Sequence, residues 1–541
     1  MASSTSRDLL LVGGRVRTLD PSRPSATAVA VRDGRIVAVG DDAAVRAQAP
    51  SGAETIDLGG AAVVPGLVDS HLHPVWGSDL AVGCDLRGLK NLDAVAAALK
   101  EERAKVPAGA WLRGWGLDYA AFAGGPITSS RLGEVLEGVP ALILFYDLHT
   151  GLASPEAFRA AGVTGPVEFD DASEVVVDEQ GVPTGELLEL SAYRHVLAAA
   201  PARTADEHRD AVAATLRRLA SLGLTGVHAM DGNPEDFALL RELEARGDLP
   251  IRIEVPLWQT PDVTDEQIEA HIPLLRERGD RWRGGIAKLF VDGVIDTGTG
   301  WLYEPDTQGE GTDPYWPDPA RYAEVVARFA RAGFQCVTHA CGDRAVRAAL
   351  DAYRDADARP ANGAQHRIEH LETLKDEDLR RLASEGVTAS MQPLHMQWRA
   401  GDGSDSWAAR LGPERTALAF RVRDILNAGA QVTLGSDWPV AQEDPRIGMA
   451  WARLRRTPGE PDAPVFEPDQ RLTAEEALQG YTTWAAQAVG EGHERGRVAE
   501  GYLADLTVLA EDPVDADPDA LLGVPTRLTV TGGEIVHRDG V

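Results

Sequence analysis

The sequence is short of several features, and each shortage excludes a class of protein. Cysteine occurs only three times in 541 residues, which is too few, and odd in number, for a disulfide framework. No apolar stretch reaches the roughly 20 residues that a membrane-spanning helix requires, and the apolar run near the N-terminus is too short for a secretory signal. Basic residues are fewer than acidic ones, 53 against 84, so the formal net charge is −31.

This negative charge limits the partners that we expect. It would repel the phosphate backbone of a nucleic acid and the anionic surface of a membrane. Hydrophobic residues make up 44% of the chain, enough for a substantial core, and the length suits a large barrel with a small appended domain. We therefore expect a cytoplasmic protein that acts on a small molecule, with neither nucleic acid nor membrane as a partner, and a homodimer stays open.

The two ends of the chain resemble each other. Near the N-terminus, "DLLLVGGRVRTLD" and "AVAVRDGRIVAVG" are β-rich runs separated by glycine turns, and "RDGR" is typical of a tight hairpin. Near the C-terminus, "ADLTVLAED" and "TRLTVTGGEIVHRDG" have the same pattern. We predict that residues 1–64 and 492–541 together form one small β-sandwich domain, and that residues 65–491 form a metal-binding barrel between its two parts.

The middle of the chain alternates apolar strands with helices. Helical segments such as "DEHRDAVAATLRRLASLG" and "RYAEVVARFARAG" end in glycine, the usual helix stop. Eight strands alternating with helices predict an α/β fold, the (β/α)₈ TIM barrel. The predicted strands are "AVVPGLVDSHLH", "ALILFYDLH", "LTGVHAMD", "GIAKLFVDG", "FQCVTHACG", "RIEHLE", "VTASMQPLH" and "VTLGSDWPV".

Two histidines one residue apart end the first of these strands, in "VVPGLVDSHLHPVWG". Side chains alternate faces along a strand, so His71 and His73 project from the same face. They could hold a metal ion between them, or they could belong to a polar loop by accident. Active sites of such barrels lie at the C-terminal ends of the strands, and the recurrence of polar residues there weighs against accident. These residues are His71, His73, His149, His228, Lys288, His339, His370, His395 and Asp437.

Six motifs in this order resemble the metal-dependent amidohydrolase superfamily. More narrowly, they resemble its branch of N-substituted formamide deformylase-like hydrolases, amidohydrolase family 3. The resemblance extends to "GVPTGELLE" and to "LTAEEALQGYTTWAAQAVG" followed by "GRVAEGYLADLTVL", so it covers nearly the whole chain. The six motifs are "VVPGLVDSHLHPVWG", "GIAKLFVDG", "THACGDRAV", "AQHRIEHLE", "SMQPLH" and "LGSDWPV".

The resemblance implies a metal site, and it assigns a metal-binding role to a residue in each of several motifs. It implies that His71 and His73 bind the more buried metal ion, that His339 and His370 bind a second ion, and that Asp437 adds a carboxylate. Neutral imidazole nitrogens and a carboxylate oxygen are ligands that Zn²⁺ accepts. We expect one or two divalent metal ions, with zinc as the expected metal.

Lys288 matches the position that carries a bridging carbamate in many relatives. A lysine ammonium has no acceptor and cannot bind a metal ion. Buried in an apolar strand beside cations, the amine would lose its proton and could then react with CO₂ to give an anion. A buried lysine paired with an acid remains the alternative, because some relatives work with one metal ion.

The reaction implied by the resemblance is hydrolysis of a carbon–nitrogen bond other than a peptide bond, in a small amide or N-substituted formamide. The metal would lower the pKa of a bound water, and Asp437, the expected catalytic residue, would accept its proton and return it to the leaving nitrogen. The same site could instead hydrolyse an ester, lactone or carbamate. A non-catalytic barrel scaffold is a more distant alternative, and the complete ligand set argues against it.

Two long segments follow the fourth and seventh strands of the expected barrel, "GVIDTGTGWLYEPDTQGEGTDPYWPD" and "HMQWRAGDGSDSWAARLG". Such lengths without secondary structure are typical of functional loops. Aromatic residues there and at other strand ends favour a partly apolar or aromatic substrate, although packing of the loops explains them equally well. The residues that we predict to contact substrate are His149, Asp292, Trp115, Trp301 and Trp438.

Other polar residues near the predicted site have two interpretations each. His366 is expected to be a hydrogen-bonded core histidine rather than a ligand, and His228 is undecided. His395 either lines the pocket or begins a loop. Asp343 either caps the helix "RAVRAALDAYRDA" or takes part in catalysis. Asp292 either orients a ligand or forms a turn.

Overall fold

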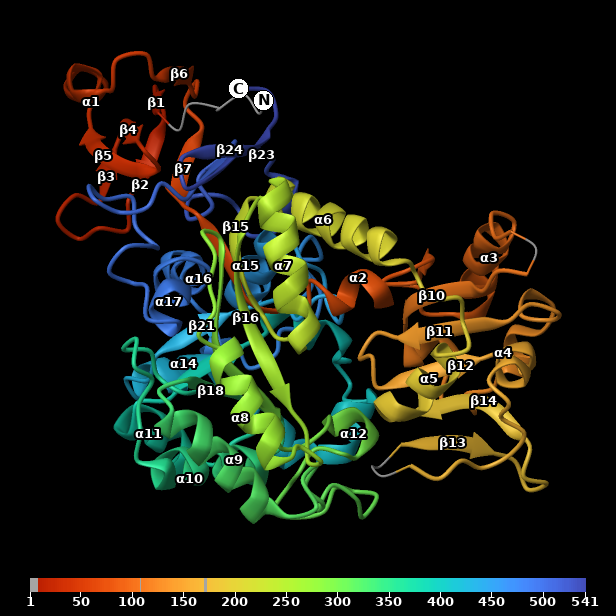
Figure 1. Cartoon of the computed structure of the whole chain (residues 1–541). Coiled ribbons are helices and arrows are strands. Elements are labelled where there is room, and N and C mark those ends of the chain that lie inside the picture. The colour runs from red at the N-terminus through yellow and green to blue at the C-terminus, as the bar shows by residue number, and fades with distance from the viewer. Residues whose placement is uncertain (1–7, 108, 170–172) are drawn as a thin grey trace. The chain divides into compact units, whose positions relative to one another are not determined.

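The structure is a computed structural model that describes residues 8–107, 109–169 and 173–541 (Figure 1). Residues 1–7, which begin both the predicted sandwich domain and the segment considered as a signal, lie outside the described residues. The chain divides into two compact units. The barrel unit comprises residues 1–73, 213–437 and 442–541, and the inserted unit comprises residues 74–212 and 438–441.

Eight parallel strands form the barrel, in the order β21-β20-β19-β18-β17-β16-β15-β8. The two outer strands of this order meet, because the Ser70 and Thr433 hydroxyl oxygens lie 2.5 Å apart and the Asp437 amide donates to the His71 carbonyl. The expected TIM barrel is therefore confirmed. Its strands are β8 (Leu67–Leu72), β15 (Leu224–Ala229), β16 (Arg252–Gln259), β17 (Trp282–Phe290), β18 (Gln335–Ala340), β19 (Arg367–His370), β20 (Thr388–Met391) and β21 (Val432–Leu434).

Amphipathic helices connect the strands and cover the barrel from outside (Figure 1). In α9, for example, Tyr322, Val325, Val326 and Phe329 recur at helical spacing and are buried. Among the described residues, none of the helices combines the length and the apolar character that crossing a membrane would need. The helices around the barrel are α6 (Ala205–Ser221), α7 (Pro234–Arg246), α8 (Asp265–Leu274), α9 (Pro319–Arg331), α10 (Asp343–Ala356), α11 (Asp376–Glu385), α14 (Val422–Asn427), α15 (Pro445–Leu454), α16 (Ala474–Gly480) and α17 (Thr483–Ala488).

Strands from both ends of the chain form the predicted small β-sandwich. The four-stranded sheet has the order β5-β4-β1-β6, and the six-stranded sheet has the order β24-β23-β22-β7-β2-β3. β7 pairs with β22, so the two ends share one sheet, and one apolar core joins residues of both sheets. The exact boundaries at residues 64 and 492 stay predictions. The strands are β1 (Leu9–Val12), β2 (Arg15–Arg17), β3 (Ser25–Ala26), β4 (Ala28–Arg32), β5 (Arg35–Gly40), β6 (Glu54–Asp57), β7 (Ala62–Pro65), β22 (Leu506–Leu509), β23 (Thr526–Thr531) and β24 (Glu534–Arg538).

The "RDGR" hairpin is confirmed. Asp33 and Gly34 have φ angles of 50° and 78°, and Arg32 pairs with Arg35 across the turn. Positive φ at both central positions is the requirement of a type I′ turn.

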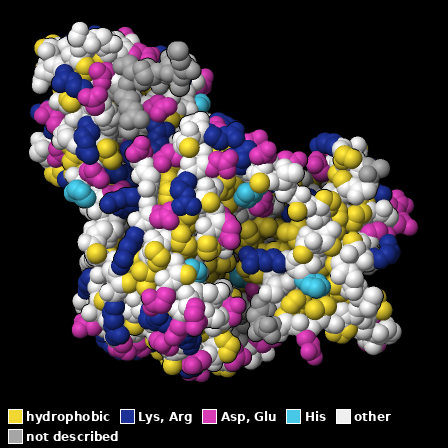
Figure 2. Space-filling view, in the orientation of Figure 1, with side chains coloured by type: hydrophobic (Ala, Val, Ile, Leu, Met, Phe, Trp, Pro, Cys, Tyr) yellow, Lys and Arg dark blue, Asp and Glu magenta, His cyan; other side chains and the backbone are white. Residues whose placement is uncertain are grey.

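On the face shown in Figure 2, acidic and basic side chains are interspersed.

The inserted unit contains a strand that the sequence assigned to the barrel. The "ALILFYDLH" segment forms β11 (Ala141–Phe145), which lies in a separate six-stranded sheet, while β16 takes the missing place in the barrel. A buried apolar run looks the same in either sheet, whereas β16, "RIEVPLWQ", is interrupted by charge and proline. The sheet has the order β13-β14-β12-β11-β10-β9. Its other strands are β9 (Cys84–Asp85), β10 (Leu112–Leu117), β12 (Thr150–Ala153), β13 (Glu174–Val177) and β14 (Pro183–Leu188), with helices α2 (Trp76–Leu80), α3 (Leu92–Arg103), α4 (Pro155–Ala160) and α5 (Glu189–Leu197).

Two local predictions were wrong. Asp343 is the first residue of α10 and not its cap, which is Gly342; the Asp343 carboxylate accepts the amide hydrogen of Tyr303 instead. The segment after β20 is not without secondary structure, because it contains the 3₁₀ helix η4 (Pro393–Trp398) and α12 (Ser406–Leu411). Asp405 caps α12 by accepting from the Ala408 amide, a signal that was present in "SDSWAARLG".

Candidate metal centre

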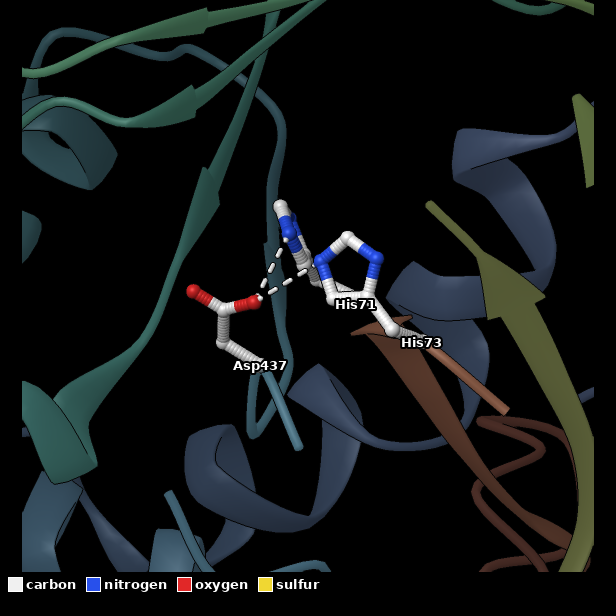
Figure 3. Close-up of side chains that lie close together, drawn as sticks. All are labelled: His71, His73 and Asp437. Atoms are coloured by element: carbon white, nitrogen blue, oxygen red, sulfur yellow. Dashed lines mark ion pairs between the residues drawn. The ribbon is translucent and has the colours of Figure 1, made fainter. Parts of the chain in front are cut away.

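His71, His73 and Asp437 converge at the C-terminal ends of β8 and β21. The Nε2 atoms of His71 and His73 each lie 3.2 Å from Oδ1 of Asp437. Figure 3 shows both imidazole rings directed toward that carboxylate. All three side chains are at least nine-tenths buried. The alternation of side chains along β8 therefore brings the two histidines to one point, as the sequence predicted.

A glycine and a buried acid hold Asp437 against β8. A side chain at Gly435 would place its Cβ only 2.6 Å from the His71 amide nitrogen, so only glycine permits this approach. The Asp69 carboxylate accepts the amide hydrogens of His71 and Ser436, which ties the two strand ends together. Burial raises the pKa of Asp69 to about 6, against the opposing effect of these hydrogen bonds. Gly435 in "LGSD" and Asp69 in "VDSHLH" thus fix the position of Asp437.

The backbone is strained at two of the predicted ligands. His370 and Asp437 have φ angles of 73° and 63°, in the left-handed region that residues with a Cβ rarely occupy. Such conformations cost of order 1–3 kcal/mol each and concentrate at functional sites. His370 is the last residue of β19, and Asp437 follows the end of β21.

His71 is oriented by a buried ion pair on its far side. Its Nδ1 lies 2.5 Å from Oε2 of Glu369, and Glu369 is in turn paired with Arg367. Burial would raise the pKa of Glu369, but Arg367, His71 and Lys288 hold it well below its usual range. An ionised carboxylate accepting from Nδ1 leaves Nε2 of His71 as the atom that faces Asp437.

His370 and His395 form a second group with Asp437. Their rings stack at 5.6 Å with an interplanar angle of 17°, and Nε2 of His395 lies 3.4 Å from Oδ2 of Asp437. On its other side, His395 Nδ1 lies 3.8 Å from the Glu372 carboxylate. Burial opposes the charged form of His395, but the carboxylates of Asp437 and Glu372 prevail and raise its pKa to about 9.

His339 lies beside His370, with ring centroids 4.5 Å apart, but its Nε2 faces another way. That nitrogen lies 2.9 Å from the Gly293 carbonyl oxygen, 3.5 Å from Cys341 Sγ and 3.6 Å from Asp292 Oδ1. His339, Cys341 and Asp292 are all buried. This is a third group of ligand-type atoms that lie within 4.8 Å of one another.

Lys288 is buried with its amine 5.0 Å from the ring centroid of Phe290, and its Nζ forms no hydrogen bond with the described residues. Burial lowers the pKa of Lys288 to about 8, although the carboxylates of Glu369 and Asp437 oppose this effect. A buried amine without a hydrogen bond is a costly arrangement. Both interpretations of Lys288, the carbamate and the buried lysine paired with an acid, stay predictions.

The donor set fits a divalent metal ion. Burial lowers the pKa of His73 to about 4 and holds that of His370 well below its usual range, so both imidazoles are neutral at pH 7. Burial would raise the pKa of Asp437, but the surrounding histidines hold it well below its usual range. Neutral imidazoles around an ionised carboxylate are the protonation states that a zinc site requires.

The residues predicted to contact substrate fall in both units. Asp292 and Trp301 are neighbours in the barrel unit, where the Asp292 carboxylate accepts the amide hydrogens of Trp301, Cys341 and Gly342. Burial raises the pKa of Asp292 to about 8, despite these hydrogen bonds. Trp115, His149 and Trp438 belong to the inserted unit. A substrate role for these five residues stays a prediction.

Sequence reasoning missed several residues around the centre. Alternation along β8 places Asp69 on the same face as His71, and alternation along β19 places Arg367 and Glu369 on one face. The alternation pattern in the sequence could therefore have identified these three residues. His366 is a core histidine as expected, because Nδ1 accepts from the Cys336 amide and Nε2 contacts the Ala358 carbonyl. His228 is buried against Arg367, whose Nη1 lies 3.1 Å from His228 Nδ1. The remaining missed neighbours of the centre are Trp258 and Phe290.

The chain is similar to known hydrolases over nearly its whole length. Residues 54–537 match the amidohydrolase family, and residues 28–51 match an imidazolonepropionase-like composite domain of bacteria. The putative amidohydrolase YtcJ of Bacillus subtilis is 28% identical over 97% of this chain and 98% of its own. The N-substituted formamide deformylase of Arthrobacter pascens is 29% identical over 97% of this chain and 98% of its own.

A solved structure has the same architecture. An uncharacterized metal-dependent hydrolase from Pyrococcus furiosus aligns with a TM-score of 0.72 and 26% identity, covering 94% of this chain and 100% of that chain. The match to the family spans the barrel and most of the sandwich, and with it every donor of the centre. The chain belongs to the amidohydrolase family and is a metal-dependent enzyme that hydrolyses carbon–nitrogen bonds other than peptide bonds.

Proposed function

We propose that this enzyme hydrolyses a small amide or N-substituted formamide, using zinc held at the barrel mouth by His71, His73 and Asp437. The observation that carries the proposal is the convergence of two neutral imidazole nitrogens on one oxygen of a buried carboxylate, each at 3.2 Å. The relative named N-substituted formamide deformylase, similar over almost the full length of both chains, supports this substrate class.

The residues of the site have different roles in the proposed hydrolysis. A divalent metal ion bound here supplies Lewis acidity and lowers the pKa of water at the site. Asp437 accepts the proton of the attacking water and delivers it to the leaving nitrogen. Glu369 and Asp69 keep His71 and Asp437 in position, through the contacts to His71 Nδ1 and to the Ser436 amide.

Lys288 is proposed to carry a carbamate. Its buried amine has a pKa lowered to about 8 and forms no hydrogen bond with the described residues, so a neutral amine is accessible near neutral pH. Reaction of that amine with CO₂ converts a cation that cannot bind metal into an anion that can. With this group, His339 and His370 complete the set that we expected for a second metal ion.

Aromatic side chains beside the centre support an apolar or aromatic substrate group. Trp258 lies 6.5 Å from His73 and 5.1 Å from Phe290, and Trp398 lies 5.3 Å from His395, each between ring centroids. Not every aromatic residue of the loops is available for substrate. The indole of Trp316 donates to the Phe290 carbonyl and is fully buried, so it packs its loop.

The substrate, compartment and assembly are parts of the same proposal. The cysteines of the described chain, Cys84, Cys336 and Cys341, are free thiols and buried, which is consistent with the cytoplasm. We propose a small-molecule substrate and neither nucleic acid nor membrane as a partner, in keeping with the net charge of −31. A homodimer stays open.

A substrate panel tests the proposed function. Zinc-loaded and chelator-treated protein would be assayed against N-substituted formamides, acyl amides and aryl esters of matched size. We expect turnover of the amide or formamide, abolished by the chelator and restored by zinc. An aryl ester or a lactone with a tenfold higher kcat/KM would favour the alternative substrates, and absence of turnover on every compound would refute the proposal.

A further inference from the structure

A cavity opens at the N-terminal ends of the barrel strands, opposite the metal centre. Its volume is about 440 Å³, within the usual range for small-molecule sites, roughly 300–1,000 Å³. Its wall is formed by the chain after α8, by the start of β17 and by the residues that lead into β18. Arg283, at this end of β17, precedes Lys288 by five residues, which is about 16 Å along a strand. A ligand bound in this cavity would therefore be separate from the metal centre.

Three arginines line this cavity, and they differ in their partners. Arg283 forms ion pairs with Glu254 and Glu491. The side chains of Arg276 and Arg278 form neither a hydrogen bond nor an ion pair with the described residues, and both residues are exposed. The chain has 84 acidic and 53 basic residues, so carboxylates for such pairs are plentiful. Two guanidinium groups without a carboxylate in one cavity point to an anion from outside the chain.

The carboxylates that line the cavity are already engaged. Glu254 is buried and forms ion pairs with Arg283 and Arg495. Glu277 pairs with Arg241 of α7. Both carboxylates are therefore neutralised by arginines other than the two exposed ones, whose charge stays available for a ligand.

Two of the arginines face each other across a short hairpin. Arg278 and Arg283 form an antiparallel β-bridge, and the Gly284 amide donates to the Glu277 carbonyl beside it. Residues directly opposite each other in an antiparallel pair project from the same face, and like charges in these positions destabilise the pair. The hairpin therefore places two guanidinium groups together on the face that borders the cavity. A bound anion would offset the repulsion between them.

Apolar side chains form another part of the lining. Leu275, Ile286 and Phe334 are buried there, and the guanidinium of Arg276 lies over the Phe334 ring, 5.9 Å from its centroid. β17 passes the cavity with a glycine, Gly285, and no atom beyond the adjoining residues lies within 4 Å of the point where a Cβ would stand. The strand thus leaves this space unfilled. An apolar and aromatic wall beside guanidinium groups suits an anion that carries an apolar or aromatic group.

We propose that this cavity is a second binding site of the enzyme, which takes a small organic carboxylate through Arg276 and Arg278. A planar guanidinium can donate two parallel hydrogen bonds to a carboxylate, and the apolar wall receives the rest of the ligand. The site does not depend on the proposed function for its geometry. If the enzyme hydrolyses amides, the acid that it releases belongs to the same chemical class.

Binding of phenylacetate tests this site. Zinc-loaded protein would be titrated calorimetrically with phenylacetate in excess acetohydroxamate, which binds zinc and keeps the probe away from the metal centre. We expect saturable binding of one phenylacetate per chain. Phenethyl alcohol has the ring without the charge, and inorganic phosphate has a charge without the ring, so each should bind at least about tenfold more weakly. Absence of saturable phenylacetate binding would overturn the proposal, as would equally tight binding of either comparison probe.

A double variant locates the site. Arg276→Gln with Arg278→Gln should weaken phenylacetate binding by at least about tenfold, because a single hydrogen bond to a charged group is worth about that factor at the low end. Both positions are exposed, so the fold should persist. The matched control, Arg32→Gln with Arg380→Gln, removes the same charge at two other exposed positions and should bind within about twofold of the parent. Parent-like binding by the first variant would overturn the proposal, as would equal weakening in the control.

Zinc content separates this site from the metal centre. The variant with both Arg276→Gln and Arg278→Gln should keep the zinc content of the parent, measured by elemental analysis, while it loses phenylacetate binding. Loss of zinc together with phenylacetate binding would show that the probe reports on the metal centre, and would overturn the proposal. Parent protein that hydrolyses no compound of the substrate panel would refute the proposed function, whereas phenylacetate binding that is lost in this variant alone would still support the second site.

Discussion

The two ends of the barrel both bury charged groups, but the described residues of the two ends differ in how completely these groups are hydrogen-bonded. At the N-terminal ends of β16 and β17, Arg252 forms an ion pair with Asp505, in the segment that leads into the sandwich. Arg283 forms ion pairs with Glu254 and with Glu491. Arg495 there is 5% exposed and reaches Glu254, Glu491 and Asp505. At the opposite end, Lys288 Nζ, His370 Nδ1 and His395 Nε2 form no hydrogen bond with the described residues.

The contrast distinguishes buried charges that stabilise the fold from buried donors that are suited to binding a ligand. A buried charge with a complete set of partners holds elements together and needs no ligand. Buried polar atoms without partners are rare in folded proteins and call for an ion, water or substrate. The same barrel thus uses hydrogen-bonded ion pairs to join its base to the sandwich, and leaves buried donors without hydrogen bonds at its proposed metal centre.

The largest expected effect is at the functional end. Asp437→Asn keeps the shape and one acceptor oxygen but cannot hold the transferred proton at neutral pH. General acid–base catalysis typically supplies about 10²–10⁴-fold, so kcat should fall by at least that factor. The fold and the ion held by His71 and His73 should persist, as shown by circular dichroism and elemental analysis. A variant with normal metal content and near-parent kcat would show that Asp437 is not the proton carrier.

At the structural end, Arg495→Met should affect stability and not chemistry. Removing one partner of a buried ion network leaves uncompensated charge and typically costs about 3–5 kcal/mol. Denaturant titration should show that loss, while kcat per folded molecule stays at the parent value. The exposed Arg380→Met is the matched control and should change stability by less than about 0.5 kcal/mol. An active but equally stable Arg495→Met protein would contradict a structural role for the network.

Glu369→Gln should give a smaller effect on the metal. The amide removes the negative charge that accepts from His71 Nδ1 and leaves Arg367 without its carboxylate partner. Loss of such an outer contact typically weakens metal binding by about 10–100-fold. Zinc competition with a chelator measures the change, with the exposed Glu266→Gln as control. Unchanged zinc affinity would mean that the position of His71 is fixed without Glu369.

The smallest effect is a pH dependence in the inserted unit. Burial, and the nearby Glu174 carboxylate, raise the pKa of Glu186 to about 7 from its ordinary 4.5. The folded state therefore holds this proton more tightly, and stability is lost as pH rises from about 4.5 through 7. Above pH 7, Glu186→Gln should therefore be more stable than the parent. Because the side chain is partly exposed, the difference in the free energy of unfolding should be on the order of 1 kcal/mol.

Melting curves between pH 4 and 8 measure this difference. The two proteins should coincide near pH 4 and separate as pH rises. The exposed Glu179→Gln should follow the parent throughout. A constant offset between Glu186→Gln and the parent at every pH would show that titration of Glu186 is not its cause.

The sequence by itself determined the features that depend on local pattern. Alternation along a strand put His71 and His73 on one face, and positive φ at Asp33 and Gly34 produced the expected hairpin. The β-rich ends predicted a shared sandwich, which the pairing of β7 with β22 confirms. The first of these features follows from the period of two residues along a strand, and the other two follow from local turn and strand preferences.

Only the tertiary structure decided which distant residues meet. An apolar run such as "ALILF" is suited to any buried sheet, so its place outside the barrel followed from pairing with β10 and β12. His71 and His73 precede Asp437 by hundreds of residues in the chain, and no local periodicity brings them to its carboxylate. These donors come close enough to hold one ion only when the barrel has closed, because only then do the ends of β8 and β21 meet.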